Sequence, residues 1–340
     1  MSGGVDSSVA AWLLKQQGCT VVGITLRLHG QADRDCTDAR RVCDKLGIEH
    51  RILDGRERFQ NMVISQFIAD YYGGRTPNPC VVCNRRIKFG WMLDEALRNG
   101  ADGIATGHYA RTTFDPVSGR WQLRRSHSGK DQSYMLYGLS QEQLAHTLFP
   151  LQNREKEEVR RLAKEADLPV ADKGDSMEIC FVPGDDYIAF LEAEAGQPMR
   201  PGNFVDTSGR VLGRHNGLPR YTVGQRKGLG ISFGRPMYVV ALDALRNEVV
   251  LGEEGQQISS VLYADEVNFL SVERPREAIA IQAKIRYQAT PAQAVLTPLD
   301  DDRVRVDFVQ PQRSITPGQA VVFYDGDLVI GGGTICSKTQ

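Results

Sequence analysis

Residues 2–8, SGGVDSS, stand directly ahead of the apolar run VAAWLL and limit, more than any other stretch, what this chain can fold into. Adjacent glycines let the backbone turn so that several N–H groups point the same way, whereas an ordinary helix cap needs only one polar side chain. A helix that begins near Ser7 adds the positive end of its dipole to these donors. The loop therefore predicts a phosphate or pyrophosphate site. It is neither a Walker A loop nor a dinucleotide GxGxxG, and a glycine-rich cap on a surface helix is the plain alternative.

Strand and helix patterns alternate over the first third of the chain. Apolar β-rich runs occupy 19–28, 50–54 and 101–110. Helical runs occupy 36–48, 59–74 and 89–100, and the segment RTPNPCVVCNRRIKFG, 75–90, is expected to be an irregular loop. This alternation predicts an α/β fold with a doubly wound parallel sheet, whose ligands collect at the carboxyl ends of the strands. A phosphate loop of this kind normally follows a buried strand, so either the true start lies upstream or the sheet lacks a central strand.

The second half of the chain changes character near residue 196. Short alternating strands with glycine turns follow, and the segments from about 278 onward are typical of a small antiparallel barrel. A length of 340 residues suggests two or three domains. We expect a catalytic domain at 1–196, a central β-rich domain at 197–256 and a C-terminal β-barrel at 257–340.

The charges and the apolar runs exclude several classes of protein. A net charge of -1 gives no global field that would recruit a polyanion. Two basic runs, 75–88 and 200–230, are rich in glycine or proline, and they fit nucleic-acid contact as well as they fit a solvated surface. No apolar stretch reaches membrane length and no signal peptide precedes the loop, so a cytoplasmic protein without a membrane partner is expected. Seven cysteines argue against a structural disulfide framework.

Cys80 and Cys83 form the motif CVVC, followed closely by Arg85, Arg86 and Lys88. Nearby cations and a helix N-terminus favour thiolate over thiol, so the pKa of these cysteines is expected to fall into the reactive range. A zinc half-site, a redox pair and a chance spacing all stay open, although neither a second CxxC nor a nearby CxxH completes a zinc tetrahedron. Cys180, in DSMEICFVP, is flanked by polar turn-forming residues, and its plain alternative is a small buried side chain.

Six motifs in order give the chain a family resemblance: SGGVDSS, TPNPCVVCN, ATGHYAR, GKDQSYML, DSMEICF and TVGQRKGLG. With these motifs the sequence resembles, essentially end to end, the tRNA-specific 2-thiouridylases, the bacterial MnmA family of the ATP-pyrophosphatase superfamily. The resemblance implies an N-terminal domain of the adenine nucleotide alpha-hydrolase type. It also implies that ATP, with Mg²⁺, adenylates the 2-carbonyl oxygen of the wobble uridine of tRNA. A cysteine persulfide then delivers sulfur, leaving AMP and 2-thiouridine.

The same resemblance assigns roles to individual residues. ATP contacts fall on Ser2, Gly3, Gly4, Asp6, Ser7, Ser8, Leu26 and Gly107. Cys83 becomes the nucleophile and Cys180 the carrier of the persulfide, and the two can close a disulfide as sulfur leaves. A persulfide needs a resolving thiol within reach, so two distant cysteines suit this chemistry better than one.

Contacts to tRNA follow from three further segments. The target base is expected at Asn78, Pro79 and Cys80, and other tRNA contacts at Lys130, Asp131, Gln132, Arg286 and Tyr287. Arg286 and Tyr287, adjacent on a strand, suit phosphate contact and base stacking. The implied partners are tRNA and a persulfide sulfur-donor protein, and a monomer is expected.

Cys80 is a departure, because some family members carry aspartate there and a role for that carboxylate in proton transfer cannot be transferred to this chain. A third cysteine also allows Cys80, Cys83 and Cys180 to hold an iron–sulfur cluster, an arrangement that three ligands suggest without establishing. No other metal ligand set is predicted. Two other classes stay open: another ATP-pyrophosphatase such as an amide-forming or lysidine synthetase, and a non-enzymatic RNA-binding or sulfur-carrier protein.

Overall fold

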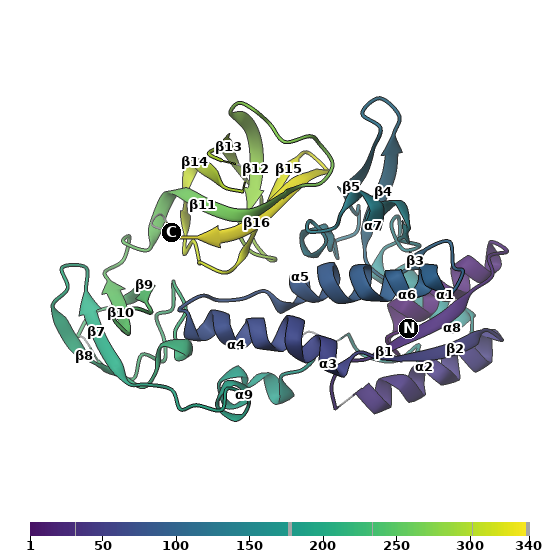
Figure 1. The fold of residues 1–340 in the computed structure, drawn as a ribbon, viewed down its shortest axis with the longest axis horizontal. Coiled ribbons are helices and arrows are strands. Elements are labelled where there is room, and N and C mark those ends of the chain that lie inside the picture. Colours follow the sequence, from purple (N-terminus) through teal and green to yellow (C-terminus); the bar gives the residue numbers. More distant parts are fainter. Residues whose placement is uncertain (31, 176–178, 233, 301, 338–340) are drawn as a thin grey trace.

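The N-terminal half of the molecule is an α/β unit. The computed structural model describes residues 1–30, 32–175, 179–232, 234–300 and 302–337 (Figure 1). The first elements are α1 (Val5–Gln16), β1 (Val22–Arg27), α2 (Ala32–Leu46), β2 (Glu49–Asp54), α3 (Arg56–Phe59), η1 (Gln60–Ile64), α4 (Ser65–Tyr72), α5 (Pro79–Cys83), η2 (Asn84–Trp91), α6 (Met92–Arg98) and β3 (Ile104–Ala105). After them come β4 (Ala110–Asp115), β5 (Arg120–Arg125), η3 (Ser133–Met135), α7 (Gln141–Ala145), β6 (Thr147–Leu148), α8 (Lys156–Glu165), η4 (Pro183–Asp185) and α9 (Tyr187–Glu194).

The predicted parallel pairing is present, but it is divided between two small sheets in the described residues. β1 runs parallel to β2, and β3 runs parallel to β6. The strand expected over 101–110 covers only Ile104–Ala105, because the chain then turns so that Gly107 lies against the start of α1. Met1, just before the phosphate loop, donates its amino group to the carbonyl of Ile24 in β1.

The expected irregular loop at 75–90 is wrong over most of its length. Pro79 begins α5, where a missing N–H costs nothing, and α5 continues directly into the π-helix η2. The hydrophobic residues Val81, Ile87 and Phe89 are buried along this stretch and stabilise it as a helix. The motif TPNPCVVCN thus places a short extended segment ahead of a helix that carries both cysteines.

The C-terminal unit is a closed antiparallel barrel, as predicted. Its strands are β11 (Ile258–Phe269), β12 (Ile279–Lys284), β13 (Ala292–Pro298), β14 (Val304–Arg313), β15 (Ala320–Asp325) and β16 (Leu328–Cys336). They follow the order β11-β14-β13-β12-β15-β16, and β16 pairs back with β11 to close the ring. The hairpin β4–β5 of the first half continues this sheet, because Arg124 in β5 pairs with Leu328 in β16.

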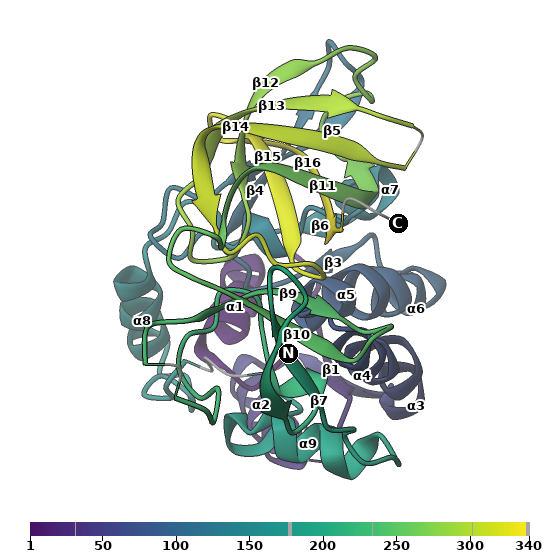
Figure 2. The same cartoon turned by 90° about the vertical axis from the view of Figure 1, so that its left-hand side faces the viewer.

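The central unit is a four-stranded sheet between these two parts in the chain. It comprises β7 (Gly202–Asp206), β8 (Val211–His215), η5 (Leu218–Arg220), β9 (Tyr238–Asp243) and β10 (Glu248–Gly252), in the order β8-β7-β10-β9. Figures 1 and 2 show α4 and α5 side by side, with the barrel on one side of α5 and the central sheet beyond the far end of α4. None of the helices in the described ranges is both long and apolar enough to cross a bilayer.

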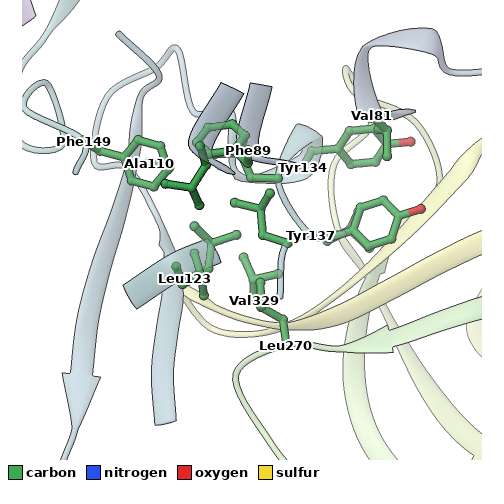
Figure 3. Packing of buried hydrophobic residues seen from close by; sticks show 14 of the residues in the cluster. Val81, Phe89, Ala110, Leu123, Tyr134, Tyr137, Phe149, Leu270 and Val329 are labelled. Atoms are coloured by element: carbon green, nitrogen blue, oxygen red, sulfur yellow. The ribbon is translucent and has the colours of Figure 1, made fainter. Parts of the chain in front are cut away.

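One hydrophobic cluster joins the α/β unit to the barrel (Figure 3). Val81 and Phe89 of the α5–η2 helix pack in it together with Leu123 of β5 and Val329 of β16. Tyr134, also in the cluster, donates its hydroxyl to the Ala320 carbonyl at 2.7 Å. The helix that carries the cysteines is therefore packed directly against the C-terminal barrel.

Candidate active site

The loop before α1 has the geometry of an anion site. Gly3 has a positive φ of 65°, and Gly4 stands at the helix N-cap without any side-chain cap. The hydroxyls of Ser7 and Ser8 turn back and donate to the Gly4 carbonyl at 3.2 and 2.8 Å. The first-turn N–H groups of α1 therefore face outward with no side-chain acceptor, which suits a phosphate. Ser8 is fully buried, so its hydroxyl shapes the loop.

Asp6 is held by two partners from other elements. Its Oδ1 accepts from the Tyr109 hydroxyl at 2.9 Å and from Lys156 Nζ at 2.6 Å. Lys156 is 6% exposed and also pairs with Asp175 at 2.8 Å. Lys156 lies in none of the predicted motifs. Its spacing from Val159 and Ala163 indicates that it belongs to the buried face of α8.

Gly107 lies against the same loop. A β-carbon at this position would come within 2.7 Å of the Asp6 carbonyl carbon and the Ser7 amide nitrogen. Any larger residue would therefore displace the start of α1. Leu26, at the end of β1, is half-buried and packs against the clusters that contain Val81 and Cys83. The structure thus brings the predicted ATP residues to the carboxyl end of β1, near the cysteine-bearing helix.

The three singled-out cysteines come together in space. Cys80 is exposed on α5, and Cys83 is buried one turn later. Cys180 is exposed, so it is not a small buried side chain, while its neighbours Phe181 and Val182 pack in the same cluster as Cys83. Negative charge on Cys80 or Cys180 raises the pKa of Cys83, which puts both of these thiols within electrostatic range of Cys83.

The predicted lowering of the thiol pKa values is wrong. Burial raises the pKa of Cys83 to about 12, and desolvation by the surrounding protein also raises the pKa of Cys80, although its side chain is exposed at the surface. Of the three nearby cations, Lys88 acts on both thiols, whereas Arg85 and Arg86 are exposed to solvent. Desolvation therefore outweighs the attraction of the cations, and Cys83 is a protonated thiol at neutral pH.

His108 lies next to Gly107 and is kept neutral. Burial and the charge of Lys88 lower its pKa to about 3. The ring nitrogen Nδ1 is 2.8 Å from the Thr106 hydroxyl, and the ring lies 5.7 Å from that of Phe89. The imidazole therefore serves this site as a neutral hydrogen-bonding group.

The segment expected to hold the target base is supported by the barrel. Thr76 donates its N–H to the Pro317 carbonyl at 2.8 Å, and Gln319 Nε2 donates to the carbonyls of Thr76 and Pro77 at 2.9 and 3.1 Å. Asn78 and Pro79 follow at the start of α5. Gln319 is not predicted from the sequence, because no pattern within TPGQ connects it to Thr76 and Pro77, about 240 positions earlier.

Lys130, Asp131 and Gln132 have partners inside the protein. Lys130 pairs with Asp175 at 2.8 Å, Asp131 accepts from the Ser126 and Ser133 N–H groups, and Gln132 Oε1 accepts from the Tyr109 N–H at 3.1 Å. The carboxylate and amide oxygens of this segment thus hold its own loop. Lys130 is 45% exposed, so its ammonium stays accessible from solvent.

Arg286 and Tyr287 lie in the turn after β12, not on a strand as expected. β12 ends at Lys284, whose ammonium lies 5.4 Å from the Tyr287 ring centre, and the chain turns there to reach β13. Arg286 is exposed and donates to the Arg313 carbonyl at 2.6 Å. Lys130 and Tyr287 influence each other's pKa, so these two segments meet although they are far apart in sequence.

Over the described ranges, no three His, Cys, Asp or Glu side chains are arranged to hold a metal ion. A magnesium ion that arrives with ATP needs few protein ligands, since phosphate and water oxygens supply most of its coordination. The uncapped loop suits such a nucleotide–metal complex.

Comparisons with known proteins cover the chain from end to end. Residues 1–184 match the family described as the tRNA methyl transferase HUP domain, 188–253 match its PRC-barrel domain, and 259–335 match the aminomethyltransferase beta-barrel domain. The tRNA-specific 2-thiouridylase MnmA of Acetivibrio thermocellus is 51% identical, with 98% of this chain and 97% of the relative covered. The tRNA-specific 2-thiouridylase MnmA 1 of Caldanaerobacter subterraneus is 49% identical, with 100% and 97% covered.

Likeness to solved structures is weak by comparison. The U34-tRNA thiolase NcsA of Methanococcus maripaludis with its [4Fe-4S] cluster gives a TM-score of 0.36 at 19% identity, covering 57% of this chain and 65% of that one.

Proposed function

Because the chain belongs to the family of the tRNA-specific 2-thiouridylases, we propose that it uses ATP and a cysteine persulfide to convert the wobble uridine of tRNA into 2-thiouridine. One observation carries the assignment of residues. The helix that bears Cys83 and the segment that bears Cys180 pack into one cluster, and Leu26 joins this cluster to the strand that ends beside the ATP loop. The nucleotide and both thiols can therefore reach one uridine.

ATP supplies the adenylyl group that turns the uridine 2-oxygen into a leaving group. The uncapped N–H groups of α1, with Gly3, Gly4 and Ser7, would hold its phosphates, and Ser2 would border the loop. The Ser8 hydroxyl and the Asp6 carboxylate would keep that loop in shape through Gly4 and Lys156. Gly107 would let the nucleotide and the loop approach each other closely, and Mg²⁺ would enter bound to the phosphates.

Two cysteines are enough to account for every bond and electron pair in the sulfur-transfer step. The terminal sulfur of a Cys180 persulfide attacks C2 of the adenylated uridine, and the C2–O bond breaks with both electrons leaving on AMP. Cys83 then attacks the Cys180 sulfur, and the electron pair of the S–S bond passes to the sulfur now on C2. Cys83 and Cys180 are oxidised to a disulfide, which an external dithiol must reduce before the next turnover.

The buried Cys83 thiol is not reactive until it loses its proton. Its raised pKa keeps it protonated in the resting enzyme, so it does not resolve the persulfide before the substrate is in place. Binding of tRNA at Asn78, Pro79 and Cys80 would change the surroundings of this thiol directly, since these residues begin its helix. Lys130, Arg286 and Tyr287 would contact tRNA from the junction with the barrel, and the loop that Asp131 and Gln132 hold together would position Lys130 there.

The remaining parts of the proposal concern the cellular setting. The exposed position of Cys180 would let a separate persulfide-bearing donor protein transfer sulfur to it. We propose a cytoplasmic monomer, in which one chain supplies both cysteines and the ATP loop.

The test is an anaerobic reaction of the purified protein with ATP, Mg²⁺, a persulfide donor and unmodified tRNA. Nucleosides are measured by mass spectrometry and iron is measured on the same sample. Formation of 2-thiouridine without iron, lost in both C83S and C180S but retained in C80S, supports the persulfide relay. Activity that follows the iron content and is lost in C80S as well supports a cluster on Cys80, Cys83 and Cys180.

A further inference from the structure

Lys88 stands one wide helical turn after Cys83. The helix η2 begins immediately after Cys83 and is a π-helix, in which hydrogen bonds join residues five apart. Residues 83 and 88 are therefore about one turn apart and lie closer to a common face than they would in an α-helix. Ile87 and Phe89, on either side of Lys88, are fully buried and fix its position, while Lys88 itself is half-buried.

The ammonium of Lys88 is close to groups from separate parts of the site. Its charge acts on the thiols of Cys80 and Cys83, on the imidazole of His108 and on the amino group of Met1. The packing explains this convergence, because the His108 ring lies 5.7 Å from the ring of Phe89 and the neighbouring Gly107 touches the start of α1. Lys88 therefore lies between the ATP loop and the thiols.

Within the part of the chain that the structure describes, no carboxylate pairs with Lys88. The groups that face it are neutral at pH 7, since burial keeps the thiols protonated and His108 uncharged. Lys156 shows the ordinary arrangement, in which a buried ammonium is matched by two carboxylates. A half-buried cation without a partner costs free energy, and that cost is recovered when an anion binds.

We propose that Lys88 binds the α-phosphate of the adenylated uridine and stabilises the negative charge that grows there as AMP leaves. The inference rests on the proposed function and adds a catalytic residue to it. When sulfur bonds to C2, the C2–O bond breaks and its electron pair stays on the oxygen of AMP, so the charge on the phosphate rises from one to two. A contact that strengthens during this step lowers its barrier.

The test compares K88M, which keeps the length of the side chain without its charge, with R98M. Arg98 ends the same continuous helical stretch, is exposed and, among the residues that the structure describes, pairs with Glu95 alone, so R98M controls for the loss of a positive charge. Calorimetry with AMP and with adenosine should show AMP binding about 10-fold more weakly to K88M and adenosine binding unchanged. In single-turnover reactions, sulfur transfer should slow about 100-fold in K88M, more than pyrophosphate release does. R98M should match the wild type in all of these measurements.

Thermal unfolding separates this role from a structural one. Because K88M removes an unpartnered charge, its midpoint should equal or exceed that of the wild type. Equal weakening of AMP and adenosine, a lowered midpoint, or sulfur transfer within threefold of the wild type would each overturn the inference. If the wild type makes no 2-thiouridine, the proposed function fails, and the AMP and adenosine measurements still decide whether Lys88 contacts a phosphate.

Discussion

The barrel and the surroundings of Cys83 differ in how well the local preferences of their residues agree with the fold. In the barrel, six strands close a ring around side chains such as Leu296, Val306 and Phe323, which are fully buried and apolar. Around Cys83, the helix is a π-helix, Lys88 pairs with no carboxylate among the residues that the structure describes, and His108 is neutral because it is buried. Local preferences agree with the fold in the first region and conflict with it in the second. Such conflict is typical of a site whose residues are kept for their chemistry.

The largest expected effect is on the rate of 2-thiouridine formation. The same Cys-to-Ser substitution is made in each region, to separate a chemical role of the thiol from a packing role. C83S should lower the rate of 2-thiouridine formation at least about 1,000-fold, because a hydroxyl cannot resolve a persulfide. C336S, in β16 of the barrel, should keep nearly full activity although burial also raises the pKa of that thiol to about 11. The measurement is nucleoside mass spectrometry over a time course. Equal loss in the two variants would contradict the contrast.

The second effect is a loss of folding stability, expected for a substitution in the core of the barrel. F323A removes a fully buried ring and should lower the free energy of unfolding by about 4 kcal/mol. V309A changes a residue of the same barrel that is 74% exposed and should stay within about 0.5 kcal/mol of the wild type. Denaturant unfolding gives both values. At low temperature, folded F323A should still thiolate tRNA, and complete inactivity there would show that the barrel core does more than support the fold.

A third, smaller effect tests how firmly charge pairing holds the ATP loop. K156M leaves Asp6 and Asp175 without their shared buried cation and should cost about 2 kcal/mol. It should also raise the KM for ATP, because Asp6 belongs to the loop that would bind phosphate. R161M, which breaks an exposed pair with Glu165 on the same helix, should cost less than about 0.5 kcal/mol. An unchanged KM in K156M would remove Asp6 from nucleotide binding.

The last expected effect is a pH dependence that comes from a buried histidine, a residue type absent from the barrel. The pKa of His108 is lowered to about 3 in the folded protein, so the unfolded chain binds a proton at this residue between about pH 6.5 and pH 3 and the folded chain does not. The contribution to stability is complete above pH 6.5 and is lost as pH falls, with a slope of up to about 1.4 kcal/mol per pH unit. The barrel residues 257–340 contain no histidine. H108Q should flatten the curve of unfolding free energy against pH, and an unchanged slope would contradict the burial of a neutral ring.

The sequence predicted most where its local pattern and the fold agree. Alternating apolar residues located β12 to β16, and glycines ahead of a helical run located the phosphate loop. β11 was not predicted, because Asp265 and Glu266 interrupt the alternation where the strand contains a bulge and Glu266 has a φ of 49°. The prolines and paired cysteines of 75–90 are typical of loops, so the pattern predicts a loop where the structure has α5 and most of η2.

The sequence predicts only those residues of the candidate site that lie within recognisable motifs. The family motifs assign Cys83, Cys180 and Gly107 to the predicted site, but the direction of the thiol pKa shift depends on burial, which no spacing reveals. Lys156 and Gln319 come from segments whose patterns are ordinary, and they reach the site only through tertiary packing. Arg286 and Tyr287 fall in a turn because β12 ends at Lys284, whereas the β-rich segment AIAIQAKIRYQA extends to Ala289.

The support of Thr76 by Pro317 and Gln319 has a consequence for the order in which the protein is made. A ribosome releases the ATP loop first, together with the two cysteines of α5, while the residues that fix the segment before α5 emerge among the last. Under the proposed function, the loop that would bind the nucleotide is therefore made long before the contacts that hold the proposed base-binding segment. A product truncated before Pro317 would lack the hydrogen bonds that hold Thr76 and Pro77 in place.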